Sequence, residues 1–137
     1  MGYEKDPSHW LRKRTPEEWI QASLAELRRA EERVKANDLT AAIAGCKRAA
    51  GMALNGALIV EPNESWGRSF VEHVAALSRD GTVPERVREA CGVLVSSRPP
   101  GADILRLRSP RSDERLLEAA RDVMAHAYAV VKRHEET

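Results

Sequence analysis

The chain has 137 residues and a formal net charge of +1, and only 4% of its residues are aromatic. This length fits one domain with a hydrophobic core, and the near-zero charge excludes binding of nucleic acid or membranes through overall charge alone. Because Ala, Leu, Glu and Arg dominate and favour helices, the composition predicts an all-α, up-and-down bundle of four to five helices and argues against a β-sandwich or barrel.

The first helix has a clear start signal. Residues 1–14 are expected to form a flexible N-terminal arm, and residues 15–137 the helical bundle. Thr15 can cap a helix, Pro16 suits the first helical position, and Glu18 completes a capping box.

A second helix should follow the Asn37-Asp38 break and cover residues 39–60. Its sequence is rich in alanine and contains three glycines, Gly45, Gly51 and Gly56. Each glycine costs about 1 kcal/mol relative to alanine inside a helix. Close helix packing would offset that cost, so this should be the central helix, packed on several neighbours or on a second copy of the chain.

Three further elements complete the predicted bundle. A third helix should begin at Ser65 and reach about Arg79, and Pro84 should open a fourth. Residues 96–111 are expected to form the one long loop, and loops of that length often carry function. Ser112 should cap the last helix, which carries acidic residues in its first turn.

The chain lacks the signs of a membrane or metal protein. Lys47 and Arg48 interrupt the longest apolar stretch, residues 39–60, so no run reaches the roughly 18 residues of a membrane span. No signal-peptide core is present, and we expect a cytoplasmic protein. Cys46 and Cys91 lie inside helical patterns, which favours buried free thiols over a disulfide. Neither has a Cys or His at metal-ligand spacing, so no metal site and no cofactor are predicted.

The last helix carries the motif that bears most on function. Residues 121–128 read Arg-Asp-Val-Met-Ala-His-Ala-Tyr. This segment resembles the motif of the HEPN family, the helical bundles associated with nucleotides and RNA. The resemblance extends to residues 22–30 and 37–58, which look like the first helical pair of HEPN domains. Ser-Arg-Pro at residues 97–99 and the segment 117–121 look like parts of one HEPN branch.

This resemblance implies a specific site. In HEPN proteins the arginine and histidine, separated by four residues, mark the active site of metal-independent endoribonucleases, to which each subunit of a dimer contributes. Many members are toxins paired with a minimal nucleotidyltransferase antitoxin, and some receive AMP on a tyrosine two residues after the histidine. Arg121 and His126 match the catalytic pair here, and Tyr128 matches the modified tyrosine.

The chemistry of these residue types fits that implication. His126 has a reference pKa of about 6.5, which suits a general acid or base, and Arg121 would stabilise charge on a phosphate. Asp122 could orient a histidine or arginine of the partner chain. Arg121 and His126 lie about 140° apart around a regular helix, so each flanks one edge of its apolar stripe. A groove between two copies could bring them together.

Other basic residues are weaker candidates. Arg68 and His73 repeat the same spacing without the neighbouring acid and tyrosine, and they rank as a second-choice motif. Arg98, Arg106 and Arg108 lie in the predicted loop, where they could bind a phosphate backbone or simply face solvent.

Three functions therefore remain open. The first is a dimeric HEPN-like endoribonuclease or toxin component. The second is a non-catalytic HEPN-like module that binds a nucleotide or a minimal nucleotidyltransferase partner. The third is a helical protein-interaction domain without a nucleotide-related activity.

Overall fold

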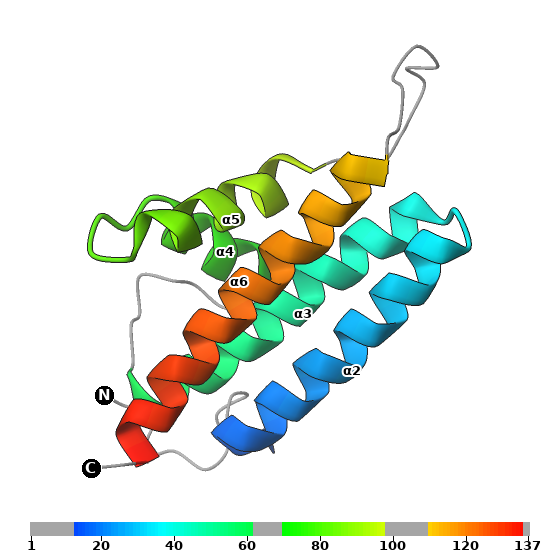
Figure 1. Ribbon diagram of the computed structural model, residues 1–137. Coiled ribbons are helices and arrows are strands. Elements are labelled where there is room, and N and C mark those ends of the chain that lie inside the picture. Colours follow the sequence, from blue (N-terminus) through cyan, green and yellow to red (C-terminus); the bar gives the residue numbers. More distant parts are fainter. Residues whose placement is uncertain (1–12, 62–69, 98–109, 136–137) are drawn as a thin grey trace.

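The computed structural model describes residues 13–61, 70–97 and 110–135. Within these ranges the chain forms helices α2 (Pro16–Lys35), α3 (Leu39–Val60), α4 (Phe70–Ser78), α5 (Glu85–Ser96) and α6 (Pro110–Glu135), and no strand. Figure 1 shows α2 and α3 as an antiparallel pair, with α6 alongside α3 and the shorter α4 and α5 packed at one side. The predicted all-α bundle is confirmed.

Local signals in the sequence set both ends of α2. The side chain of Thr15 accepts a hydrogen bond from the amide of Glu18 at 3.1 Å, and the Glu18 carboxylate accepts one from the amide of Thr15 at 2.8 Å. This is the predicted capping box. At the other end Asn37 adopts a φ of 61°, and the amide of Asp38 donates to the carbonyl of Arg33 at 2.9 Å. Such a left-handed residue closes a helix and turns the chain back.

Helix α3 is the centre of the bundle, as its glycines predicted. It contacts each of the other four helices described in the structure. A Cβ atom added at Gly45 would lie 3.2 Å from the Cβ of Ala30, and one added at Gly56 would lie 2.9 Å from the carbonyl oxygen of Pro16. The helix that packs closely against these two glycines is therefore α2 of the same chain.

The later helices differ from the predictions at their ends. The predicted start of the third helix, Ser65, lies outside the described residues. Pro84 is the N-cap of α5 and precedes its first residue. Helix α6 begins at Pro110, so Ser112 lies inside its first turn and the predicted cap is wrong. Proline favours the first position of a helix because its φ is already helical and it has no amide hydrogen to satisfy there.

The core is built mostly from small and aliphatic side chains. Its largest fully buried residues include Trp19, Leu54, Leu77 and Leu94. Both cysteines are buried and free, as predicted, and burial raises the pKa of each thiol to about 12. Most of the expected N-terminal arm lies outside the described residues, but the guanidinium of Arg14 stands 4.9 Å from the ring centre of Trp19. None of the helices in the described ranges is long and apolar enough to cross a membrane.

Candidate functional site

The two ends of the Arg-x4-His motif lie on opposite flanks of α6. Arg121 faces α2, where its guanidinium stands 3.3 Å from the carboxylate of Glu31. His126 faces the turn between α4 and α5 and is half-buried. The buried side chains of Val123 and Ala127 form the apolar stripe that these two residues flank. A single chain therefore does not bring Arg121 and His126 into one site.

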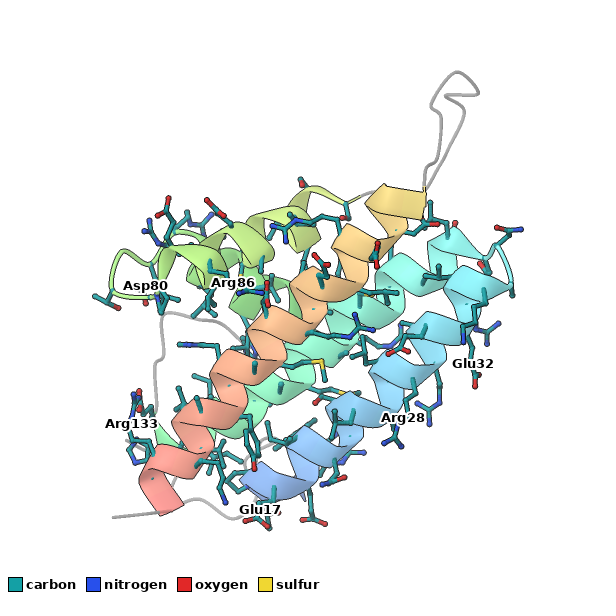
Figure 2. The ribbon with its side chains drawn as sticks, viewed as in Figure 1. Glu17, Arg28, Glu32, Asp80, Arg86 and Arg133 are labelled. Carbon is teal, nitrogen blue, oxygen red and sulfur yellow. The ribbon has the colours of Figure 1, made fainter. Side chains whose placement is uncertain are left out.

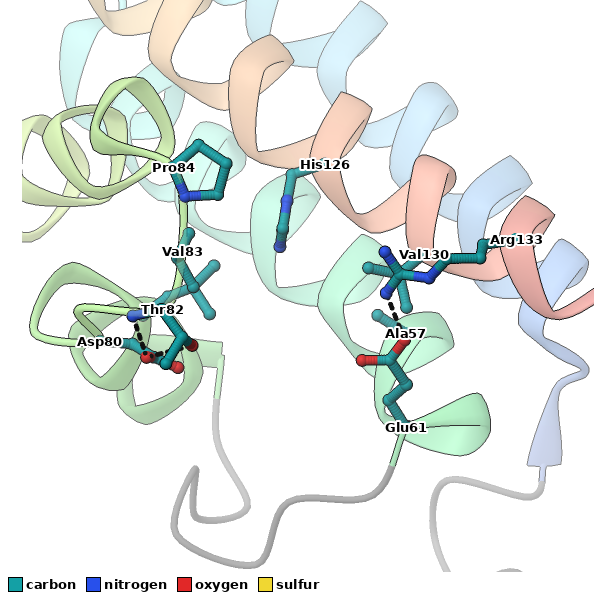
Figure 3. A pocket seen from close by; sticks show the side chains of 10 residues that line it. Ala57, Glu61, Asp80, Thr82, Val83, Pro84, His126, Val130 and Arg133 are labelled. Carbon is teal, nitrogen blue, oxygen red and sulfur yellow. Dashed lines mark hydrogen bonds and ion pairs between the residues drawn. The ribbon is translucent and has the colours of Figure 1, made fainter.

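His126 lines a cleft with a volume of about 530 Å³. The cleft is formed by the ends of α3 and α4, the α4–α5 turn and the second half of α6 (Figure 3). Its lining combines aliphatic side chains with polar and charged ones. The residues that line it with His126 are Ala57, Glu61, Leu77, Asp80, Thr82, Val83, Pro84, Val130 and Arg133.

The surroundings of His126 favour the neutral imidazole. Burial lowers its pKa below 6.5, and the positive charge of Arg133 lowers it further, against the opposing effect of Glu61 and Asp80. At neutral pH the ring is therefore uncharged and can accept a proton. No hydrogen bond joins His126 to any other residue in the described part of the chain, so its ring nitrogens remain available to a ligand.

An ion-pair cluster closes one end of the cleft. One carboxylate oxygen of Glu61 accepts a hydrogen bond from Arg133 and stands 2.8 Å from the Nε2 atom of His134. Burial alone would raise the pKa of Glu61, but the hydrogen bonds from Arg133 and His134 outweigh it and lower that pKa. The cluster joins the C-terminal end of α3 to that of α6.

A carboxylate marks the other end of the cleft. Asp80 accepts hydrogen bonds from the amide of Thr82 at 2.9 Å and from its hydroxyl at 2.6 Å, and both lower the pKa of Asp80. Figure 2 shows Asp80 and Arg133 on one side of the bundle, away from the labelled side chains Arg28 and Glu32 of α2. Glu61 and Asp80 are both negative at neutral pH, whereas Arg133 is the one cation that lines the described cleft.

The other flank of α6 forms a second, more apolar groove. Arg121 and Tyr128 line it together, as their seven-residue spacing predicts, with Leu24 and Leu27 of α2 opposite. The groove has a volume of about 540 Å³. Tyr128 is 49% exposed and Leu24 is 37% exposed, so the groove carries two large, accessible side chains.

The remaining predicted residues have different positions. Asp122 forms an ion pair with Arg86 at 3.2 Å, and this pair links α6 to α5 within one chain. His73 is fully buried, and in this conformation it cannot touch a substrate. Four arginines of the prediction lie outside the described residues: Arg68, Arg98, Arg106 and Arg108.

Sequence reasoning missed the residues that face His126. Glu61 and Asp80 stand at the ends of different helices, and only the folded chain brings them to α6. Arg133 did leave a signal, since a spacing of seven residues places it almost directly above His126 on the same helix face.

The fold and the cleft define the class of this protein as an all-α helical bundle with a histidine-lined cleft on its last helix. Comparison with family models, curated proteins and solved structures found no match to the chain. Any narrower assignment therefore depends on the residues of α6 and on the chemistry of the two grooves beside it.

Proposed function

We propose that the protein is a HEPN-like endoribonuclease that needs no metal ion and uses His126 as its general acid and base. One observation supports this most strongly. His126 stands in an open cleft, its pKa is lowered so that the ring is neutral at pH 7, and it makes no hydrogen bond in the described part of the chain. A general base must be a neutral imidazole with a ring nitrogen that can accept the proton of the substrate.

The proposed reaction uses the ribose of the substrate itself. His126 accepts the proton of a 2′-hydroxyl, and the 2′-oxygen then bonds to the adjacent phosphorus. The bond from phosphorus to the 5′-oxygen breaks, and that oxygen takes a proton from the imidazolium of His126 as it leaves. The products are a 2′,3′-cyclic phosphate and a 5′-hydroxyl. Arg121 stabilises the negative charge that builds on the phosphate, since a guanidinium is always charged and binds phosphate oxygens in pairs.

This reaction requires two copies of the chain. Arg121 and His126 of one chain face opposite sides of α6, but both border its exposed face, where Ala125 and Ala129 leave room for a neighbour. A twofold contact across this face would place the arginine of one copy beside the histidine of the other. The homodimer is therefore part of the proposal, with Asp122 at the same contact.

A second function has its own support. Arg121 and Asp122 already form ion pairs within their own chain, with Glu31 and Arg86 respectively. Tyr128 is half-exposed in the same groove as Arg121. These contacts suit a non-catalytic HEPN-like module that binds a nucleotide or a minimal nucleotidyltransferase and accepts AMP on Tyr128.

An RNA cleavage assay separates the two functions. Purified protein is incubated with single-stranded RNA in EDTA, and the products are tested for 2′,3′-cyclic phosphate ends. Wild type should cleave, His126→Gln and Arg121→Gln should lose activity, and Arg29→Gln, an exposed arginine of α2, should retain it. Intact RNA with folded wild-type protein would exclude the endoribonuclease. A nucleotide-induced rise in melting temperature, or AMP transfer to Tyr128, would then favour the second function.

A further inference from the structure

The structure points to Arg133 as the phosphate-binding cation of the His126 cleft, and to Glu61 as a built-in competitor that occupies this arginine when no ligand is bound. This inference rests on the proposed function for its ligand, a segment of RNA. It adds a residue that the Arg-x4-His motif does not contain and a way in which the chain regulates the cleft.

The geometry of α6 brings Arg133 to His126. Seven residues complete almost two helical turns, so the two side chains lie on the same face, about 10 Å apart along the axis. Side chains on a helix lean toward its N-terminus, which turns Arg133 back toward His126. Figure 3 shows this guanidinium extending along the cleft on the His126 side. Arg121, by contrast, lies in the groove on the opposite flank.

Glu61 holds the position that a phosphate would take. One oxygen of its carboxylate accepts a hydrogen bond from Arg133 and stands within hydrogen-bond distance of His134. A guanidinium binds carboxylate and phosphate oxygens with the same pair of parallel donors, so the two anions compete for it. Glu61 is the C-cap residue of α3, so the competing carboxylate belongs to the same chain as Arg133.

The charges that line the cleft indicate how the Glu61–Arg133 ion pair affects phosphate binding. With Glu61 in place, the lining holds two negative carboxylates, Glu61 and Asp80, against the single positive charge of Arg133, while His126 is neutral. The resulting charge of about −1 repels a phosphate. If Glu61 turns away, the guanidinium of Arg133, whose side chain is 65% exposed, loses its carboxylate partner.

The ion pair is weak enough for an RNA ligand to replace. The side chains of Arg133 and Glu61 are 65% and 43% exposed. Exposed ion pairs of this kind change an equilibrium by about fivefold at most. Removing the charge of Glu61 should therefore strengthen binding by up to about fivefold.

The test measures binding separately from cleavage. The probe is a fluorescent RNA pentamer with 2′-O-methyl riboses, which cannot be cleaved through the 2′-oxygen, titrated in EDTA at pH 7. Glu61→Gln should bind up to about fivefold more tightly than wild type, and Arg133→Gln about tenfold more weakly, because it loses a charged hydrogen bond. Glu32→Gln removes the same charge from an exposed position on α2, away from the cleft (Figure 2), and serves as the matched control, with unchanged binding expected.

The double variant makes the test specific. In the Arg133→Gln background, Glu61→Gln should give less than a twofold gain, because Glu61 acts through Arg133. The inference would be overturned by equal gains in both backgrounds, an equal gain from Glu32→Gln, wild-type binding by Arg133→Gln, or no binding by any variant. Melting temperatures establish that each variant is folded.

The two proposals can fail separately. If the binding changes occur but wild type cleaves no RNA, the endoribonuclease is wrong and the Arg133 site stands. If wild type cleaves RNA through His126 while Arg133→Gln cleaves and binds normally, the Arg133 site alone is wrong.

Discussion

Replacing Gly92 with alanine should stabilise the protein, whereas the same change at Gly56 should give no gain and should leave the protein less stable than Gly92→Ala. Both glycines lie inside helices, α3 and α5 respectively, so both variants gain helix propensity. Their surroundings differ. A Cβ at Gly56 would lie 2.9 Å from the carbonyl oxygen of Pro16 and 3.4 Å from the Cβ of Trp19, whereas one at Gly92 would meet nothing within 4 Å.

The magnitudes follow from two opposing effects. Alanine in place of glycine stabilises a helix interior by about 1 kcal/mol. Forcing an extra methyl group into a packed contact costs about 1–3 kcal/mol, and here the contacting atom is backbone, which cannot rotate away. Gly92→Ala should thus gain about 1 kcal/mol, and Gly56→Ala should be about 1–3 kcal/mol less stable than Gly92→Ala. Gly45→Ala, with a side-chain contact at 3.2 Å, should lie between them.

Urea unfolding followed by circular dichroism measures these differences. The dependence of the unfolding free energy on urea concentration should be the same for all variants, since the surface exposed on unfolding does not change. If Gly56→Ala were as stable as Gly92→Ala, the close contact of α3 with α2 would not exist as described, and the role assigned to the glycines would be wrong.

Three further predictions concern the surface, the cleft and the thiols. A double-mutant cycle on Arg121 and Glu31 should give a coupling of about 0.2–1 kcal/mol that falls in 1 M salt, as expected for an exposed pair; a coupling above about 2 kcal/mol would contradict the exposure of both groups. Because the pKa of His126 is lowered in the folded state, the unfolded chain binds its proton more readily below pH 6.5. The contribution of neutral His126 to the unfolding free energy is therefore fully present above pH 6.5. It is lost as the pH falls from 6.5 toward the pKa of His126 in the folded state, by at most about 1.4 kcal/mol per pH unit. His126→Gln should lack this component in urea unfolding at pH 7 and pH 5.5, and an identical pH dependence in the variant would refute the assignment. Cys46 and Cys91, with pKa values raised to about 12, should resist a thiol reagent at pH 8 in the folded protein and react in urea; rapid labelling without urea would show that they are accessible.

Local signals predicted much of this fold. The capping box at Thr15 and Glu18 and the break at Asn37 each involve residues within a few positions of one another, so the sequence alone carries them. The glycines of α3 predicted close helix packing, and the structure shows that α2 is the helix that packs against Gly45 and Gly56. The cap at Ser112 was wrong because Pro110, two residues earlier, is an equally good helix start.

The site was less predictable, for a physical reason. The motif located His126, and helix geometry correctly separated it from Arg121. What faces His126 depends on tertiary packing, since Glu61 ends α3 and Asp80 follows α4. No periodicity within α6 reveals those two residues. Arg133 was within reach of sequence reasoning through its seven-residue spacing, but the Arg-x4-His pattern drew attention to the other arginine.

The central claim is that RNA binds in the cleft beside His126, and histidine side-chain NMR tests it most directly. Protein labelled with ¹⁵N in its histidines is titrated with the 2′-O-methyl RNA pentamer at pH 7 in EDTA. The ring nitrogens of His126 should shift as the RNA binds, whereas those of the fully buried His73 should stay fixed. Saturation of binding with no change at His126 would place the RNA elsewhere and contradict the account.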